Sequence, residues 1–418
     1  MKKVTLTLAL VALLAFGGQA FGELCTIDQV PAATLLIPYF AVDVSDGACD
    51  DPTSLTTVFT VSNASAAPTV AHVTVWTDWT VPALDFDIYL TGFDVQTVNA
   101  KDWFCSGNLP QTGSAVSNQG AFSLPNTAPP SCNNTATPGA GPNYANPAII
   151  EAFRDHLTNW FTGNQSAVTG DCAGSGQEGD TAVGYITIDT VADCNLLFPS
   201  SATYWGGGIA TLDNQLWGEY FYVDQANDFA QALPAVHIEA DASLTTGADA
   251  TFYGRYSAGL DGREPLPTTF AARYATGGAF DGTNFNVWRE GSAAAAAVGC
   301  GGAPSWYPID LSNTTGNGAI IAFDEEENPV IVTSGPSGFP SEEITIPNET
   351  QSLAVGSELS VGSFSFGWVY MNLQNSRAVA PSPGQAWVSQ IWSNSGRFSG
   401  GWDATQLDSG CSPTVTNP

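Results

Sequence analysis

Two glutamates in aromatic-rich segments are the residues of this sequence with the clearest potential for catalysis. Glu219 lies in LWGEYFYVD and Glu239 in VHIEAD, and burial beside aromatic rings raises the pKa of a carboxyl group. A glycosidase uses two such groups roughly 5 to 10 Å apart, one as an acid and the other as a nucleophile or base. The sequence leaves their separation open, and forty carboxylates make such a pair easy to find by chance. A secreted carbohydrate-active enzyme that uses a carboxylate pair is therefore one alternative for the function.

Metal binding is a second chemistry to consider. His237 and Glu239 are two residues apart, so they project from the same face of a strand, and DVSDGACDD at 43–51 clusters aspartates. Calcium prefers oxygen ligands of this kind, although the cluster lacks the spacing of an EF-hand loop. We expect a solvated acidic loop and a solvent-facing strand surface instead, and no cofactor beyond the option of calcium. The candidate metal ligands are Asp43, Asp46, Asp50 and His237.

Nucleophilic hydrolysis has little support. It needs a positioned serine or cysteine, a histidine and usually a carboxylate. The chain has three histidines, at positions 72, 156 and 237, and no GxSxG motif. We therefore do not expect a serine or cysteine hydrolase, and the sequence as a whole favours a protein without enzymatic activity.

Aromatic side chains offer binding without catalysis. The chain contains 12 tryptophans, 12 tyrosines and 22 phenylalanines, most of which we expect inside β-sheet cores. Tryptophans near predicted loops or on solvent-facing strand positions would present flat rings to sugar rings or to a surface protein. The candidate ligand-binding residues are Trp76, Trp79, Trp392 and Trp402.

Alternation of apolar and polar residues identifies the elements that carry these groups. Such alternation in 71–76 and 84–90 predicts an antiparallel hairpin with one buried face and one solvent-facing face. We expect the polar set, which includes His72 and Trp76, to face water. The expected cross-strand pairs are His72 with Tyr89, Thr74 with Asp87, and Trp76 with Asp85.

One segment has the three-and-four spacing of an amphipathic helix. In NPAIIEAFRDHLTNWFTG, Asn146 is a suitable N-cap, Pro147 suits the first helical position, and Gly163 supplies a stop. The pattern predicts a helix over 147–162 that packs on a sheet.

The composition predicts an all-β fold. With 43 glycines, 26 prolines and a low charged fraction, the chain favours short strands joined by loops. We expect an immunoglobulin-like β-sandwich, stabilised by disulfides, with a central β-rich insertion that carries the helix. The predicted segments are a signal peptide at 1–22, an N-terminal sandwich at 23–135, a central region at 136–298, and a C-terminal β region at 299–418 that packs with the N-terminal sandwich.

The N-terminus predicts export. Lys2 and Lys3 precede an apolar run at 4–16, which matches a secretory signal peptide and is too short to span a bilayer. We expect cleavage before Glu23, no membrane insertion, and an extracellular, cell-surface or periplasmic location. Removal of the two lysines changes the formal charge from −30 to −32. Such a charge repels nucleic acid, which is therefore excluded as a partner.

Eight cysteines in an exported chain predict disulfides, although spacing alone leaves 105 pairings open. We expect neighbours along the chain to pair. The expected pairs are Cys25 with Cys49, Cys105 with Cys132, Cys172 with Cys194, and Cys300 with Cys411.

Several segments together resemble a group of exported bacterial proteins to which no activity is assigned. They are LLIPYFAVD, TVFTVSNASAAPTVAHVTVWTDW, LDFDIYLTGFDVQTVN, LWGEYFYVD, FAQALPAVHIEAD and TFYGRYSAGLDGREPLPTTFAARY. Residues 57–98 also resemble immunoglobulin-like modules of surface proteins. These resemblances imply export and a β fold, and they bring no catalytic residues. We expect a non-enzymatic protein with a structural, adhesive or ligand-binding role, or a self-assembling subunit of a surface filament.

Overall fold

A computed structural model shows how these elements assemble. It describes residues 25, 27–107, 109–110, 147–158, 174, 179–195, 197–246, 251–277, 282–290, 309–310, 320–331, 333–334, 343–344, 348–373, 384–394 and 396–410. Antiparallel strands dominate, so the expectation of a mainly β fold is confirmed. The predicted signal peptide lies outside the described residues.

The first sheet has five strands in the order β4-β3-β6-β1-β9. Its central strand, β6, comes from a segment that is far from its neighbours in the chain. All pairings within the sheet are antiparallel, and β1 has an irregularity between Ile37 and Phe40. The strands are β1 (Thr34–Asp43), β3 (Thr69–Thr77), β4 (Pro82–Leu90), β6 (Thr181–Val191) and β9 (Val236–Ile238).

A second sheet, in the order β5-β2-β7-β8, packs against the first. The inner faces of the two sheets share one apolar core, to which Leu35, Phe59 and Tyr220 belong. Strands from 181–238 thus complete both sheets begun by the first hundred residues. The strands of the second sheet are β2 (Thr56–Asn63), β5 (Val95–Asn99), β7 (Leu216–Asp224) and β8 (Phe229–Pro234).

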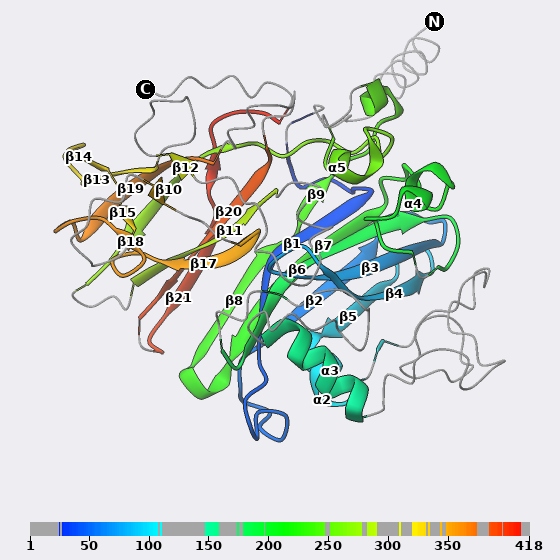
Figure 1. Cartoon of the computed structure of the whole chain (residues 1–418), viewed down its shortest axis with the longest axis horizontal. Helices are drawn as coiled ribbons and strands as arrows, with labels where there is room; N and C mark the ends of the chain where they lie inside the picture. The colour runs from blue at the N-terminus through cyan, green and yellow to red at the C-terminus, as the bar shows by residue number, and fades with distance from the viewer. Residues whose placement is uncertain are drawn as a thin grey trace, which may run out of the picture.

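Two helices cover one end of this core, below the sheets in Figure 1. The predicted amphipathic helix is confirmed as α3 (Pro147–Thr158), and residues 159–162 lie outside the described part. The strand pattern did not predict α2 (Ala100–Cys105), which Asn99 caps by accepting a hydrogen bond from the Lys101 amide. Phe104 of α2 stacks on Phe153 of α3, with ring centroids 4.8 Å apart.

A second group of strands lies to the left in Figure 1. Two sheets, β14-β13-β19-β10-β22 and β17-β11-β20-β21, enclose an apolar core that contains Phe270, Trp288 and Val388. Contacts of β1 with β11 and β17, and of β8 with β21, join this group to the first two sheets. The strands are β10 (Thr269–Ala275), β11 (Gly282–Arg289), β13 (Ile320–Phe323), β14 (Pro329–Ile331), β17 (Thr350–Ala354), β19 (Phe366–Asn372), β20 (Ala386–Ser393), β21 (Ser399–Asp403) and β22 (Thr405–Gln406).

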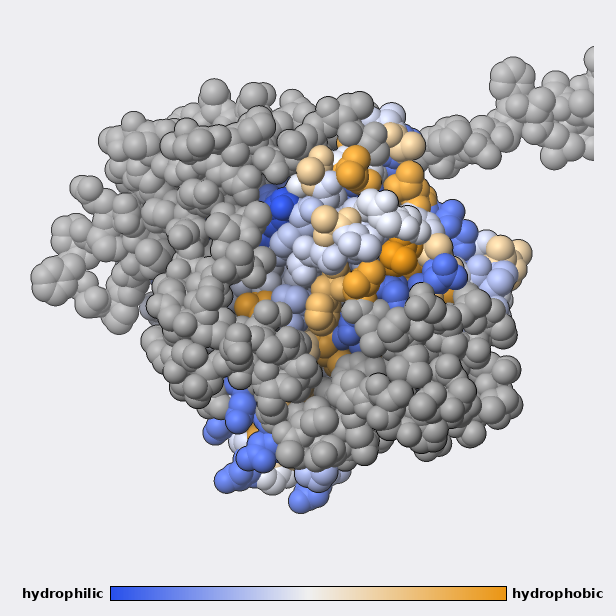
Figure 2. Space-filling view, turned by 45° about the vertical axis from the view of Figure 1, so that its right-hand side comes forward, coloured by the Kyte–Doolittle hydropathy of each residue, from blue (hydrophilic) through white to orange (hydrophobic). Residues whose placement is uncertain are grey.

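Short elements complete the described structure. Two strand pairs form small sheets of their own: β12 (Ile309–Asp310) with β16 (Glu343–Ile344), and β15 (Thr333–Ser334) with β18 (Leu359–Ser360). Figure 2 shows a face on which hydrophobic residues lie beside hydrophilic ones across the middle of the molecule. The short helices are α4 (Ala202–Gly206), α5 (Gly254–Ser257), η1 (Gln225–Asn227) and η2 (Ala242–Thr246).

The β3–β4 hairpin forms as predicted, but its predicted register and solvent-facing side are wrong. The turn is tighter than expected, because the Thr77 amide bonds to the Val81 carbonyl. The partners of His72 and Thr74 therefore move by two residues, and the partner of Trp76 moves by three because the register shifts between Val75 and Trp76. The face that carries His72 and Trp76 is buried, because later segments of the chain cover it. The observed pairs are His72 with Asp87, Thr74 with Asp85, and Trp76 with Pro82.

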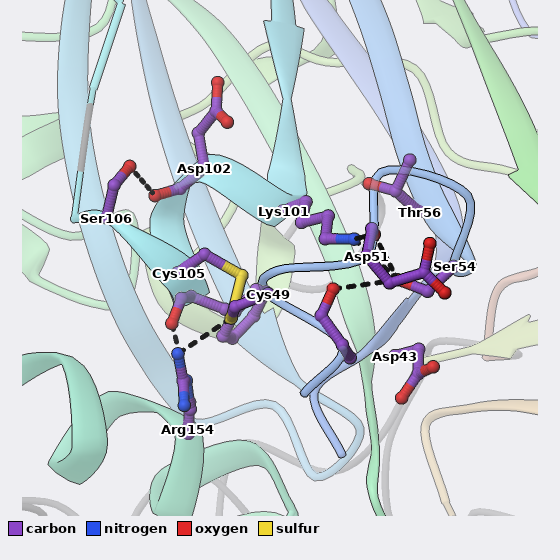
Figure 3. Close-up of a disulfide and its surroundings, with 12 residues drawn as sticks. Asp43, Cys49, Asp51, Ser54, Thr56, Lys101, Asp102, Cys105, Ser106 and Arg154 are labelled. Atoms are coloured by element: carbon purple, nitrogen blue, oxygen red, sulfur yellow. Dashed lines mark hydrogen bonds between the residues drawn. A yellow bond between two sulfur atoms is a disulfide. The ribbon is translucent and has the colours of Figure 1, made fainter. Parts of the chain in front are cut away.

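Cys49 and Cys105 form a disulfide, shown in Figure 3. This bond contradicts the predicted partners of both residues, because pairing of β2 with β5 brings the loop after β1 close to α2. Cys25 and Cys194 each take part in a disulfide as well. The other four cysteines lie outside the described residues: Cys132, Cys172, Cys300 and Cys411. The predicted Cys172–Cys194 and Cys300–Cys411 pairs involve these cysteines and stay predictions.

Two basic side chains brace the surroundings of this disulfide (Figure 3). Lys101 donates from Nζ to the Asp51 carbonyl oxygen and to Ser54 Oγ, the latter at 2.5 Å. Arg154 of α3 donates from Nε to the Phe104 carbonyl oxygen at 2.5 Å, and its Nη2 lies 2.9 Å from Cys49 Sγ. The loop, α2 and α3 are thereby held together at one end of the first core.

Candidate functional site

A cavity of about 600 Å³ in the second group of strands has the strongest features of a binding site. We call it the aromatic pocket. Residues from β10, β19 and β20 line it, and the turn between β13 and β14 contributes acidic residues at its rim. The lining residues with the most evident binding chemistry are Arg273, Phe366, Trp368, Trp392, Thr405 and Glu325.

Strand register places one wall of the aromatic pocket. Trp368 of β19 pairs with Arg273 of β10 on one side and with Phe323 of β13 on the other. The Phe323 and Trp368 rings stack with centroids 4.2 Å apart and planes at 7°. Position 367 must be glycine for this approach, because a Cβ there would lie 1.7 Å from the Phe323 carbonyl oxygen. The wall is therefore fixed by backbone packing as well as by ring contact.

A second tryptophan of the pocket, Trp392, comes from β20. Trp392 is half-buried and lines the pocket, while Trp402 is 50% exposed. Their rings meet edge to face, with centroids 5.4 Å apart. Gly400 of β21 leaves room for the Trp402 ring to lie over the backbone, because a Cβ there would lie 2.7 Å from that ring. Trp368 and Trp392 thus both line the pocket, and Trp402 packs against Trp392 from outside the lining.

Arg273 supplies a cation between these aromatic residues. Its side chain is exposed and forms no hydrogen bond or ion pair with the part of the chain that the structure describes. This is unusual here, because Lys101, Arg263 and Arg289 are buried. A guanidinium offers five N–H donors in a planar fork, which suits carboxylates and neighbouring hydroxyl groups. Arg273 is therefore available for a ligand.

One acidic residue at the rim of the pocket, Asp324, accepts hydrogen bonds from within the β13–β14 turn. Asp324 accepts hydrogen bonds from the Asn328 amide and side chain, both at 2.8 Å, and these bonds lower its pKa. Burial, with Asp324 and Glu325 nearby, raises the pKa of Tyr274 to about 12, so its hydroxyl stays protonated and donates to the Phe323 carbonyl oxygen. Glu325 is exposed and can accept hydrogen bonds from a ligand.

The four candidate tryptophans fall into two sets. Trp392 lines the aromatic pocket, and Trp402 contacts Trp392 without being a lining residue. Trp76 is 1% exposed, donates from Nε1 to Thr187 Oγ1 at 2.9 Å and stacks on a tyrosine, so the expectation that it faces water is wrong. Trp79 is half-buried and donates to Asn348 Oδ1 at 2.8 Å.

Sequence reasoning missed the other half of the aromatic pocket. Phe366 and Trp368 alternate in SFSFGWVYMNL, and this period-2 pattern was the available signal that both rings share one face. Arg273 gave no comparable signal, because its place beside Trp368 depends on the pairing of β10 with β19.

The carboxylate pair does not assemble in either of the two cavities described here. Glu219 is exposed on β7, so the burial expected for it is wrong. Glu239 follows β9 and is half-buried, and burial together with the charge of Asp28 raises its pKa. Neither glutamate lines a described cavity.

The candidate metal ligands lie apart. His237 is 2% exposed, so its predicted solvent-facing position is wrong; its Nδ1 lies 2.6 Å from the Val30 carbonyl oxygen, and burial lowers its pKa. It lies opposite Leu35, eight residues along β1 from Asp43, which is roughly 26 Å at the rise of a strand. Asp43 accepts hydrogen bonds from the Ser45 amide and hydroxyl, and Asp46 and Asp50 occupy the loop that follows. The described residues contain no group of three or more metal-ligating side chains.

A buried polar row crosses four strands of the first sheet. Nδ1 of His72 lies 2.7 Å from Asp87 Oδ1, and His72 pairs on its other side with Asp189. Asp189 in turn accepts from Thr34 Oγ1 at 2.5 Å, and Arg263 Nε donates to the same hydroxyl oxygen at 2.9 Å. Hydroxyls of Tyr204 and Tyr253 close the row at 3.1 Å from Asp189.

The polar row favours protonated histidine but is closed to a substrate. Burial opposes the charged form of His72, yet Asp87 and then Asp85 outweigh it and raise the pKa. Burial also raises the pKa of Asp85 to about 7. His72 and Asp189 are both 0% exposed. The row therefore acts on stability and its pH dependence. His156 lies on α3, and its side chain is outside the described part.

Comparison with protein families, curated proteins and solved structures finds no match to this chain. Among the described residues, none of the helices combines the length and the apolar character needed to cross a bilayer.

Proposed function

We propose that this chain is an exported, non-enzymatic protein that binds carbohydrate in the aromatic pocket. The observation that carries the proposal is the set of aromatic rings that line the pocket, Phe366 and Trp368 of β19 and Trp392 of β20, together with the exposed Arg273. The apolar faces of a sugar ring fit against indole rings, while its hydroxyls require donors and acceptors at the edges. The cavity volume of about 600 Å³ is within the usual range for small ligands.

Charge narrows the class of carbohydrate. The chain has a formal charge of −30, so a polyanionic glycan is repelled at long range. Arg273 still offers one bidentate position for a carboxylate or for two adjacent hydroxyls, and Glu325 at the rim accepts from hydroxyls. We therefore propose a neutral glycan, or one with a single carboxylate at the position bound by Arg273.

Export and a surface role are part of the same proposal. The signal-peptide pattern and the disulfide that pins α2 to the loop after β1 support an oxidising location. The bacterial origin and the immunoglobulin-like character of 57–98 remain predictions from the sequence resemblance. The carboxylate-pair enzyme and the filament subunit remain alternatives, and neither gains support from a particular contact in the described residues.

The test is a glycan array followed by titration calorimetry on the purified mature protein, with and without calcium. For a glycan that binds, Trp368→Ala should weaken the affinity at least tenfold, which corresponds to about 1.4 kcal/mol. Trp217→Ala is the matched control, because Trp217 is a tryptophan with a 38% exposed side chain that lies on β7, in the other half of the protein. Equal effects of the two substitutions, or no glycan bound at millimolar concentration, would refute the proposal.

A further inference from the structure

A second cavity, of about 750 Å³, lies where the two groups of strands meet. We call it the junction cleft. One side comes from β1, β7 and the turn before β8, and the other from β11, β20 and the turn before β21. The junction cleft shares no lining residue with the aromatic pocket. The residues that carry the following argument are Tyr39, Tyr222, Asp224, Asp228, Asn284 and Phe398.

The floor of the junction cleft is a preformed aromatic surface. The rings of Tyr39 and Tyr222 have centroids 6.3 Å apart and planes at 53°. The Tyr222 hydroxyl donates to the Tyr39 carbonyl oxygen at 2.8 Å and accepts from Asn286 Nδ2 at 3.1 Å. Because both tyrosines are more than nine-tenths buried, little ordering is needed when a ligand arrives. Phe398, 48% exposed, adds an accessible ring at the mouth.

Two carboxylates stand beside these rings. Asp224 is held by hydrogen bonds from the Asn227 amide at 3.2 Å and side chain at 2.8 Å. Asp228 is exposed, and its backbone has a φ of 51°. Gly396 of the opposite turn packs directly on it, because a Cβ at 396 would lie 2.9 Å from Asp228 Cβ. The position of the Asp228 residue is therefore set by its own turn before β8 and by the turn before β21 that packs on it.

The described lining of the junction cleft contains no lysine, arginine or histidine. Arg397 is exposed in the turn before β21 but is not a lining residue. The faces of aromatic rings attract cations, most strongly where water is partly excluded. The negative charge of the whole chain raises the local concentration of cations and lowers that of anions. Asn284, Ser352 and Ser393 add neutral hydrogen-bonding groups.

We propose that the junction cleft binds a small organic cation, an ammonium group seated among Tyr39, Tyr222 and Phe398 and paired with Asp228. The polar part of the ligand contacts Asn284 and the two serines. This site is independent of the proposed carbohydrate site, since the two cavities have different walls.

The experiment compares a cation with a neutral molecule of the same shape. Choline and n-butylammonium are titrated into the mature protein by calorimetry, beside the neutral isostere of choline in which carbon replaces nitrogen. We expect at least one cation to bind at least tenfold more tightly than the isostere, with an affinity that falls as salt is added. Equal affinities for cation and isostere, or no binding by either cation, would overturn the proposal.

Variants assign the binding to this cleft. Asp228→Asn should weaken cation binding at least fivefold. A second variant, Phe398→Ala, removes the accessible ring at the mouth of the cleft, at an exposed position where the folded protein tolerates the change. Asp213→Asn is the matched control, because Asp213 is exposed and lies outside the cleft. Trp368→Ala, at a residue that lines only the aromatic pocket, should leave cation binding unchanged, so failure of the carbohydrate proposal can be recognised separately. An effect of Asp213→Asn as large as that of Asp228→Asn would contradict the assignment.

Discussion

Replacement of Asp85 by asparagine should make the protein less sensitive to pH. Asp85 is 6% exposed, and its Oδ2 lies 3.8 Å from His72 Nε2 within the first sheet. Burial raises the pKa of this carboxyl from 3.8 to about 7. Asparagine has nearly the same shape and cannot ionise, so it removes the cost of burying a charge while the packing is retained.

The sign of the effect follows from proton linkage. A carboxyl group whose pKa is higher in the folded protein binds protons more tightly when folded, so stability falls as the pH rises from the unfolded pKa to the folded one. The raised pKa of His72 acts in the same direction. For Asp85, a shift from 3.8 to about 7 corresponds to about 4 kcal/mol in total, of which about 3 kcal/mol falls between pH 5 and pH 8.

The measurement is the free energy of unfolding from urea titrations at several pH values. We expect wild type to lose stability from pH 5 to pH 8, and Asp85→Asn to lose about 3 kcal/mol less over that range. The free energy of unfolding of the variant should still fall somewhat as the pH rises, because burial also raises the pKa of Glu264 to about 8 and of Asp403 to about 6. The exposed Asp46→Asn variant is the control. The reasoning is refuted if Asp85→Asn and wild type have parallel pH profiles.

Three further outcomes can be checked. Joint replacement of Cys49 and Cys105 by serine should cost about 4 kcal/mol of unfolding free energy in urea titrations, because the bond closes a loop with a sequence separation of 56. Gly367→Ala should lower the melting temperature measured by calorimetry, since the added Cβ collides with the β13 backbone, whereas unchanged melting would contradict the packing described. Trypsin should cut at the exposed Arg397 before the buried Lys101, as read by mass spectrometry of timed digests.

The elements with clear periodicity could be predicted from the sequence. Alternation located β3 and β4, and three-and-four spacing with a proline start located α3. The register of the hairpin could not be predicted from alternation, because a shift of two residues keeps every side chain on the same face. The tight turn after Thr77 decided between these registers.

The burial of polar faces depended on distant parts of the chain. His72 lies between the apolar Ala71 and Val73, as a solvent-facing residue of a strand would, yet Tyr204 and Tyr253, from later segments, cover the row to which it belongs. The same limitation applies to the aromatic pocket. Local sequence identified Trp392, whereas Arg273 is placed beside Trp368 only by long-range strand pairing.

The inward placement of basic side chains has a consequence for how copies of the protein meet. Lys101, Arg263 and Arg289 brace the interior, and of the basic residues that the structure describes only Arg273 and Arg397 are exposed. The charged side chains on the described surface are thus almost all negative. Neighbouring molecules have few opposite charges with which to associate, so dissolved salt, by shortening the range of their repulsion, governs how closely they can crowd together.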